Sequence, residues 1–239
     1  DSVRLHGQPI DAAYWPRVAA SVREVWQRQG IEARNAVVLL PYANLLPIAR
    51  QAFAQTPGWQ PRIETLPTLA DALGPPPVWQ PGQVSGDARI DQLEAQRLLA
   101  DADQPLWAPT LATLAQQLHQ ASAAWPPEER SARWQRLREA LPPLSAGTPG
   151  GIERSLLRAA MAWASIGEPA PGDALWGHKP SAWVAVIAGG RQALVDAVLQ
   201  AARVQGLPVL EVVSDVPSDA RFAACLPPRV VVPITRQTK

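Results

Sequence analysis

The chain has 239 residues, of which 47% are hydrophobic and 18% charged, a composition typical of a globular protein and not of a disordered one. With 22 basic and 21 acidic residues its net charge is +1, so charge alone makes no strong case for nucleic-acid binding. The apolar runs, such as 182–188, are far shorter than the ~20 residues of a membrane span, and a single cysteine, Cys225, excludes an internal disulfide and a cysteine-based metal site.

The same features favour a cytoplasmic protein without a cofactor. A lone cysteine fits a reducing compartment, and no basic segment followed by an apolar stretch marks a secretory signal at the start of the chain. The chain begins at Asp1 without a methionine, which weakens that second observation. His6, His119 and His178 lack the spacing of metal ligands. We expect no metal, no cofactor and no membrane contact.

The first 86 residues alternate between strand and helix signals. The apolar run 36–40, ended by Pro41, is typical of a parallel strand buried on both faces. Gly30 is expected to end the helix before it, and Asn44 to cap the helix after it. In chain order the signals are strand 3–5, helix 12–29, strand 36–40, helix 45–55, strand 62–66 and helix 69–73. This order predicts an α/β fold with a parallel, Rossmann-like sheet of the kind found in P-loop NTPases.

The middle of the chain changes character after a stretch rich in Pro, Gly and Gln at 74–86. Four amphipathic helices are predicted beyond it, with Thr110 as the N-cap of the second. Their expected apolar faces are Ile90, Leu93, Arg97 and Leu98; Leu111, Leu114, Leu118, Ala121 and Trp125; Trp134, Leu137 and Leu141; and Ile152, Leu156, Ala160 and Trp163. We expect a helical subdomain at 87–167, inserted into an α/β layer formed by 1–86 and 168–239.

Strand signals return in the last part of the chain. They lie at 182–187, 209–213 and 230–232, with a helix at 194–202 between the first two. Gly189 and Gly190 follow the first of these strands. A lone glycine pair is a weak sign of phosphate binding, and a tight strand-to-helix turn explains it better.

Motifs of nucleotide hydrolysis and DNA cleavage are missing. The loop at 6–9, after the first strand, has one glycine and no lysine, and neither Lys179 nor Lys239 follows a glycine, so a Walker A motif is excluded. Asp215 is the candidate for a Walker B acid, but a turn-forming role suits it better. The PD-(D/E)XK nuclease pattern is absent, because neither lysine has an acidic residue two positions before it. We therefore expect this chain to have no enzymatic activity of its own.

Ten tryptophans raise the alternative of base stacking. Most recur at helical spacing or within a strand and are interpreted as core residues: Trp15, Trp26, Trp125, Trp134, Trp163 and Trp183. Four lie beside proline or glycine and are the better candidates for surface contacts: Trp59, Trp79, Trp107 and Trp176.

One segment resembles a known family. The sequence from Val37 through Leu40-Pro41-Tyr42-Ala43-Asn44 to Phe53, followed by Pro61-Arg62-Ile63-Glu64-Thr65-Leu66, is similar to the start of AddB/RexB-type helicase-nuclease subunits. In that family a strand ending in Leu-Pro leads into a helix, much as motif Ia of superfamily I helicases does. The unit 3–26 resembles the family's strand, decayed Walker A loop and long helix. The likeness covers about the first 125 residues.

The resemblance implies an inactivated superfamily I helicase domain from bacterial double-strand-break repair. Such a module would contact single-stranded DNA, with Pro41, Tyr42 and Asn44 facing the strand, and would scaffold an active helicase subunit. The family's nuclease domain lies outside this sequence, so the chain would correspond to an N-terminal part. Two alternatives stay open: a small-molecule enzyme that uses the crevice near Tyr42 and Gly189, and a pure protein-interaction scaffold.

Overall fold

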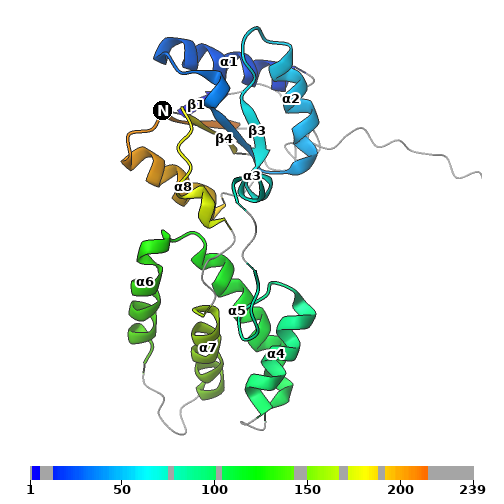
Figure 1. The fold of residues 1–239 in the computed structure, drawn as a ribbon, viewed down its shortest axis with the longest axis vertical. Helices are drawn as coiled ribbons and strands as arrows, with labels where there is room; N and C mark the ends of the chain where they lie inside the picture. Colours follow the sequence, from blue (N-terminus) through cyan, green and yellow to red (C-terminus); the bar gives the residue numbers. More distant parts are fainter. Residues whose placement is uncertain are drawn as a thin grey trace, which may run out of the picture. The chain divides into compact units, whose positions relative to one another are not determined.

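The computed structural model describes residues 2–5, 13–74, 78–100, 104–142, 150–166, 172–187 and 192–214 (Figure 1). The chain divides into two compact units. The sheet unit comprises 1–66, 179–191 and 202–239, and the helical unit comprises 67–178 and 192–201. The helical unit is therefore longer at both ends than the predicted subdomain at 87–167. The predicted strand at 230–232, the loop at 6–9, Gly189, Gly190, Asp215 and Cys225 lie outside the described residues.

The sheet unit is built on five parallel strands, which confirms the predicted parallel, Rossmann-like α/β sheet. The strands are β1 (Ser2–Leu5), β2 (Val37–Leu40), β3 (Arg62–Thr65), β4 (Trp183–Ile187) and β5 (Val209–Ser214). Their order across the sheet is β1-β5-β4-β2-β3. In the centre, Val38 of β2 is in register with Ile63 on one side and Val184 on the other. Because every pair is parallel, all five strands end at the same edge.

One face of this sheet packs against α1 (Tyr14–Gln29) and α2 (Leu46–Ala54). The alternate strand residues Val38, Ile63 and Val184 join a core to which α1 contributes Trp15, Val18, Val22 and Trp26. All four residues of β2 are buried, as expected for a strand covered on both faces. Gly30 ends α1 with φ 67°, a left-handed conformation that favours glycine, so its predicted role is confirmed.

The helical unit contains the four predicted helices and more. Its helices are α3 (Leu66–Leu73, which begins at the last residue of the sheet unit), α4 (Ala88–Ala100), α5 (Ala108–Ser122), α6 (Pro127–Ala140), α7 (Gly151–Ala164) and the first part of α8 (Ala193–Val204). Leu111, Leu156 and Trp163 belong to a core shared by α4, α5 and α7. A second core around Trp134 and Met161 joins α6 to α7. No described helix is long and apolar enough to cross a membrane.

The predicted face of α4 is wrong. Ile90, Leu93 and Leu98 are exposed by 40, 66 and 49%, whereas the buried positions are Asp91, Ala95 and Leu99. The reason is the fully buried carboxylate of Asp91, described below, whose hydrogen bonds fix which side of the helix faces inward.

The predicted cap of α5 is also wrong. The N-cap position is Trp107, which makes no side-chain capping hydrogen bond, and Thr110 lies within the first turn. Proline in the first turn removes one of the N–H groups that a capping side chain would satisfy. The buried positions of α5 include Leu111, Ala115 and His119, while Ala121 is exposed.

Candidate nucleic-acid interface

The loop that follows β2 carries all three residues predicted to face a DNA strand. After Leu40 the chain passes through Pro41 and Tyr42 into a short 3-10 turn, Ala43–Leu45, which leads directly into α2. The Leu45 side chain is fully buried, and its N–H donates to the carbonyl of Tyr42 at 3.2 Å. The loop is thereby anchored at Leu45, while the Tyr42 ring remains 39% exposed.

Asn44 is not the N-cap of α2. The cap position is Leu45, and neither the 3-10 turn nor α2 has a side-chain capping hydrogen bond. The extra turn before the helix moves Asn44 one residue too early to reach the helix N–H groups. Its amide is exposed and makes no hydrogen bond within the described residues, so it is available to an external partner.

The sheet topology gives this loop a special position. β2 pairs with β3 on one side and with β4 on the other. Beyond β4, the sheet continues with β5. The two central strands β2 and β4 therefore lead outward in opposite directions. In open α/β sheets, ligands bind outside the carboxyl ends of the strands at such a switch point. Pro41, Tyr42 and Asn44 occupy the β2 side of it.

The arginines of β3 and α2 are engaged by the protein. Arg50 donates to the carbonyl of Ile63 at 3.0 Å and lies 3.4 Å from the Glu64 carboxylate, which is also 4.0 Å from Arg62. Glu64 compensates much of the positive charge in this region. The loop thus offers an aromatic ring and an amide and not a cluster of uncompensated cations, consistent with the near-neutral composition.

The tryptophans divide between core and surface largely as predicted. Of the core candidates, Trp15, Trp26, Trp134, Trp163 and Trp183 are at most 6% exposed, and Trp125 is partly buried. Of the surface candidates, Trp59, Trp79 and Trp107 are exposed by 70, 41 and 37%. Trp176 is half-buried, with its indole nitrogen enclosed, so it offers less surface than the other three.

The most exposed of these rings, Trp59, lies away from the predicted loop. Trp59 precedes β3, and its ring lies under the guanidinium of Arg34, whose Cζ is 5.4 Å from the ring centroid. Arg34 itself lies in the short turn just before β2. Both residues are therefore at the amino edge of the sheet, whereas Tyr42 is at the carboxyl edge. The structure does not bring Trp59 and Tyr42 into one aromatic track.

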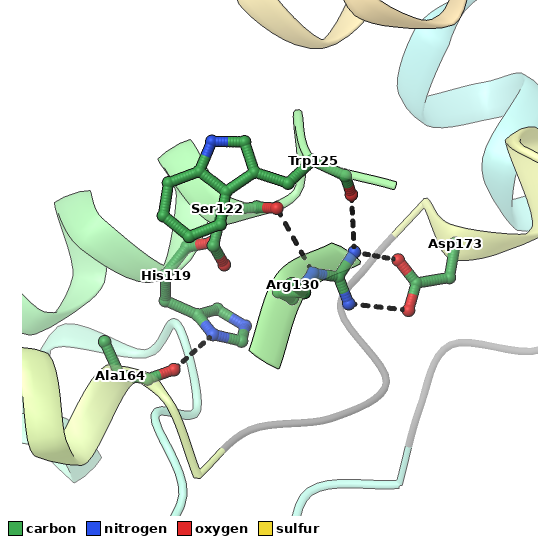
Figure 2. A network of polar contacts seen from close by, with 6 residues as sticks. All are labelled: His119, Ser122, Trp125, Arg130, Ala164 and Asp173. Atoms are coloured by element: carbon green, nitrogen blue, oxygen red, sulfur yellow. Dashed lines mark hydrogen bonds and ion pairs between the residues drawn. The ribbon is translucent and has the colours of Figure 1, made fainter. Parts of the chain in front are cut away.

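A buried polar network that the sequence did not reveal lies in the helical unit (Figure 2). The Arg130 side chain is 2% exposed and donates to both carboxylate oxygens of Asp173, at 2.6 and 3.0 Å. It also donates to the carbonyls of Ser122 and Trp125, each at 3.2 Å. Arg130 thus ties the start of α6 to the end of α5 and to the 3-10 turn Asp173–Leu175.

His119 lies in the same region, and its surroundings lower its pKa. Its Nδ1 is 3.4 Å from the Ala164 carbonyl (Figure 2). Burial is the main cause that lowers the pKa of His119, and the positive charge of Arg130 adds to it; the Ala164 contact and the carboxylates of Asp91 and Asp173 act in the opposite direction.

A second buried anchor is the Asp91 carboxylate, which is fully buried. It accepts hydrogen bonds from the Ser85 N–H at 2.7 Å, the Ser85 hydroxyl at 2.8 Å, the Gly86 N–H at 3.0 Å and the Gln116 amide at 2.7 Å. These bonds join the loop before α4 to α5. The four hydrogen bonds to Asp91 fill the accepting capacity of its carboxylate, which is the arrangement of a structural group and not of a poised acid or base.

Among the described residues, no group of three or more His, Cys, Asp or Glu side chains could hold a metal ion. Comparison of the chain with known proteins found no matching family model, no matching curated protein and no matching solved structure. Function is therefore inferred from the geometry of the loop after β2, the chemistry of its side chains and the family resemblance of the segment 37–66.

Proposed function

We propose that the chain is a non-catalytic, degenerate superfamily I helicase-like module of a bacterial double-strand-break repair helicase-nuclease. In this proposal the loop 41–44 contacts single-stranded DNA, and the rest of the chain scaffolds an active helicase subunit. The observation that carries the proposal is the exposed Tyr42 ring beside the unbonded Asn44 amide, at the carboxyl edge where parallel sheets bind ligands.

The local fold supports the resemblance from which the proposal starts. The segment 37–53 forms a buried parallel strand that ends at Leu40-Pro41 and leads into α2, and Arg62–Thr65 forms the next strand. A tyrosine ring and a side-chain amide are suited to a nucleobase, since the ring stacks on its face and the amide bonds its edge. The buried groups Asp91 and Arg130 lend no support to the alternative of a small-molecule enzyme, because other residues of the chain engage them.

The test is a fluorescence-anisotropy titration of a labelled oligo(dT) strand at low and moderate salt, with ATP hydrolysis measured on the same sample. Stacking contributes about 1–3 kcal/mol per base, so Tyr42→Leu is expected to weaken binding by about 5- to 150-fold. Asn44→Ala is expected to weaken it by a smaller factor. Gln51→Ala, which removes an exposed amide from α2, is the matched control and should bind like the unaltered chain.

The salt dependence provides a second criterion. Because Glu64 compensates Arg50 and Arg62, few phosphates are neutralised and affinity should fall only shallowly with salt. ATP turnover intrinsic to the chain would refute the non-catalytic proposal. Binding that is indifferent to Tyr42→Leu would refute the assignment of the loop, and no binding at low salt would favour the pure scaffold.

A further inference from the structure

The outer edge of β3 is an open edge of the sheet. Within the described part of the chain, β3 pairs only with β2 and is the last strand on its side. The Arg62 N–H donates to the Ala36 carbonyl at 2.9 Å, so the backbone groups of Arg62 point towards β2. Backbone groups of successive strand residues point in alternate directions, and those of Ile63 therefore point outward. Ile63 presents one donor and one acceptor at this edge.

Arg50 occupies the same edge from the neighbouring helix. It lies on α2, and its Nη2 donates to the outward carbonyl of Ile63 at 3.0 Å and lies 3.4 Å from the Glu64 carboxylate. The Arg50 side chain is 55% exposed, so it covers the edge from the solvent side. Another strand that paired here would donate its own N–H to the Ile63 carbonyl. Arg50 would have to move away before that strand could bind.

The edge is complementary to a second copy of itself. Arg62 and Glu64 flank Ile63 symmetrically, and both side chains are partly exposed. If two β3 strands lie antiparallel with Ile63 opposite Ile63, each Ile63 N–H donates to the carbonyl of the other. The same register places Arg62 of each copy directly opposite Glu64 of the other. Directly opposed unlike charges stabilise a pair of strands, whereas directly opposed like charges destabilise it.

From these observations we infer that the β3 edge is a self-association surface for a second copy of this chain, and that Arg50 keeps it closed. Displacement of Arg50 exposes the Ile63 carbonyl and removes one partner from the Glu64 carboxylate. The backbone acceptor and the charged side chain therefore become available together. The loop 41–44 is not part of this surface, so the inference does not depend on the proposed contact with DNA.

The first test compares the unaltered chain with Arg50→Ala by sedimentation velocity over a range of protein concentrations. Each dimer requires the release of two partly exposed Arg50 contacts, each equivalent to about a tenfold effect, so Arg50→Ala should strengthen self-association about a hundredfold. Arg28→Ala is the matched control, because Arg28 is a 68% exposed arginine of the sheet unit that pairs with Glu24 of its own helix. It should behave like the unaltered chain.

The second test uses charge reversal to establish the register. Arg50→Ala/Arg62→Glu has an acid on both sides of Ile63, and Arg50→Ala/Glu64→Arg has a base on both sides. Either variant alone would oppose like charges and should remain monomeric. Their mixture opposes unlike charges at both positions and should form a heterodimer. Because each variant is its own folded control in circular dichroism, a gain on mixing cannot come from a repaired fold.

Hydrogen exchange locates the contact. In Arg50→Ala, exchange of the Ile63 amide should become slower as the protein concentration rises, because that N–H becomes bonded across the edge. A monomeric Arg50→Ala at all concentrations would overturn the inference, as would equal self-association of the unaltered chain. Self-association that survives in either charge variant alone would place the contact elsewhere and would also overturn it.

Discussion

Replacing Arg130 with methionine is expected to destabilise the helical unit by about 3 kcal/mol. The substitution preserves much of the side-chain length but removes the charge and all four hydrogen bonds to Asp173, Ser122 and Trp125. Breaking a buried ion pair from one side costs about 3–5 kcal/mol. The Asp173 side chain keeps 19% exposure, so water partly solvates the orphaned carboxylate and the cost falls at the lower end.

The measurement is native-state hydrogen exchange, which reports the two units separately. Amides of α5, α6 and α7 should lose protection equivalent to about 3 kcal/mol, and amides of β2 and β4 should change much less. The double variant Arg130→Met/Asp173→Leu should recover part of the loss, because a buried pair replaced on both sides leaves no unpaired charge.

A loss below about 1 kcal/mol in the helical unit would refute this reasoning, since it would mean that water or a rearranged side chain replaces the network at little cost. An equal loss in β2 and β4 would contradict the assignment of the effect to the helical unit. Arg133→Met is the control, because Arg133 is a partly exposed arginine of the same helix with an i,i+4 partner, a kind of pair that contributes about 0.3–0.5 kcal/mol.

Three further outcomes follow from single residues. Gly30→Ala should cost about 1–2 kcal/mol in urea unfolding, because no atom lies within 4 Å of the added Cβ and only the positive φ opposes it; Gly30→Asn should cost less. Asp91→Asn should lower the free energy of unfolding by about 1–3 kcal/mol, because the new amide NH₂ would face an N–H group that now donates to the carboxylate. Hydrogen exchange of the α4 amides measures this loss. The lowered pKa of His119 means that the unfolded chain binds more protons, so stability is highest above the unfolded pKa of about 6.5 and falls as pH decreases towards the folded pKa; His119→Gln should flatten that part of the stability profile.

The sheet was predictable from sequence because its strands are short apolar runs separated by clear stops. β2 was bounded by Pro41, and α1 by Gly30, each of which acts through its own backbone geometry. The strand order was not predictable, because the pairing of β2 with β4 depends on residues far apart in the chain. Local signals carry no information about such pairing.

The errors arose where a polar side chain or a turn overrode periodicity. On α4 the pattern of Ile90, Leu93 and Leu98 predicted an inward face, but the hydrogen bonds of Asp91 turn that face outward. Asn44 has the residue type of an N-cap, yet a 3-10 turn separates it from the helix. The apolar run ended by Pro41 places the loop 41–44 directly after β2, whereas the exposure of its side chains depends on the tertiary structure.

The pairing of β2 with β4 also determines the order in which the chain can fold. Residues 67–178 lie between the two strands, so during synthesis β2 and β3 emerge long before β4 can complete the centre of the sheet. Until then the hydrophobic edge of β2 has no partner strand, which makes it a site for aggregation or chaperone binding. β1 can pair only after β5 has been synthesised. Contacts between such distant segments slow folding, so we expect the helical unit to form first and the sheet to close last.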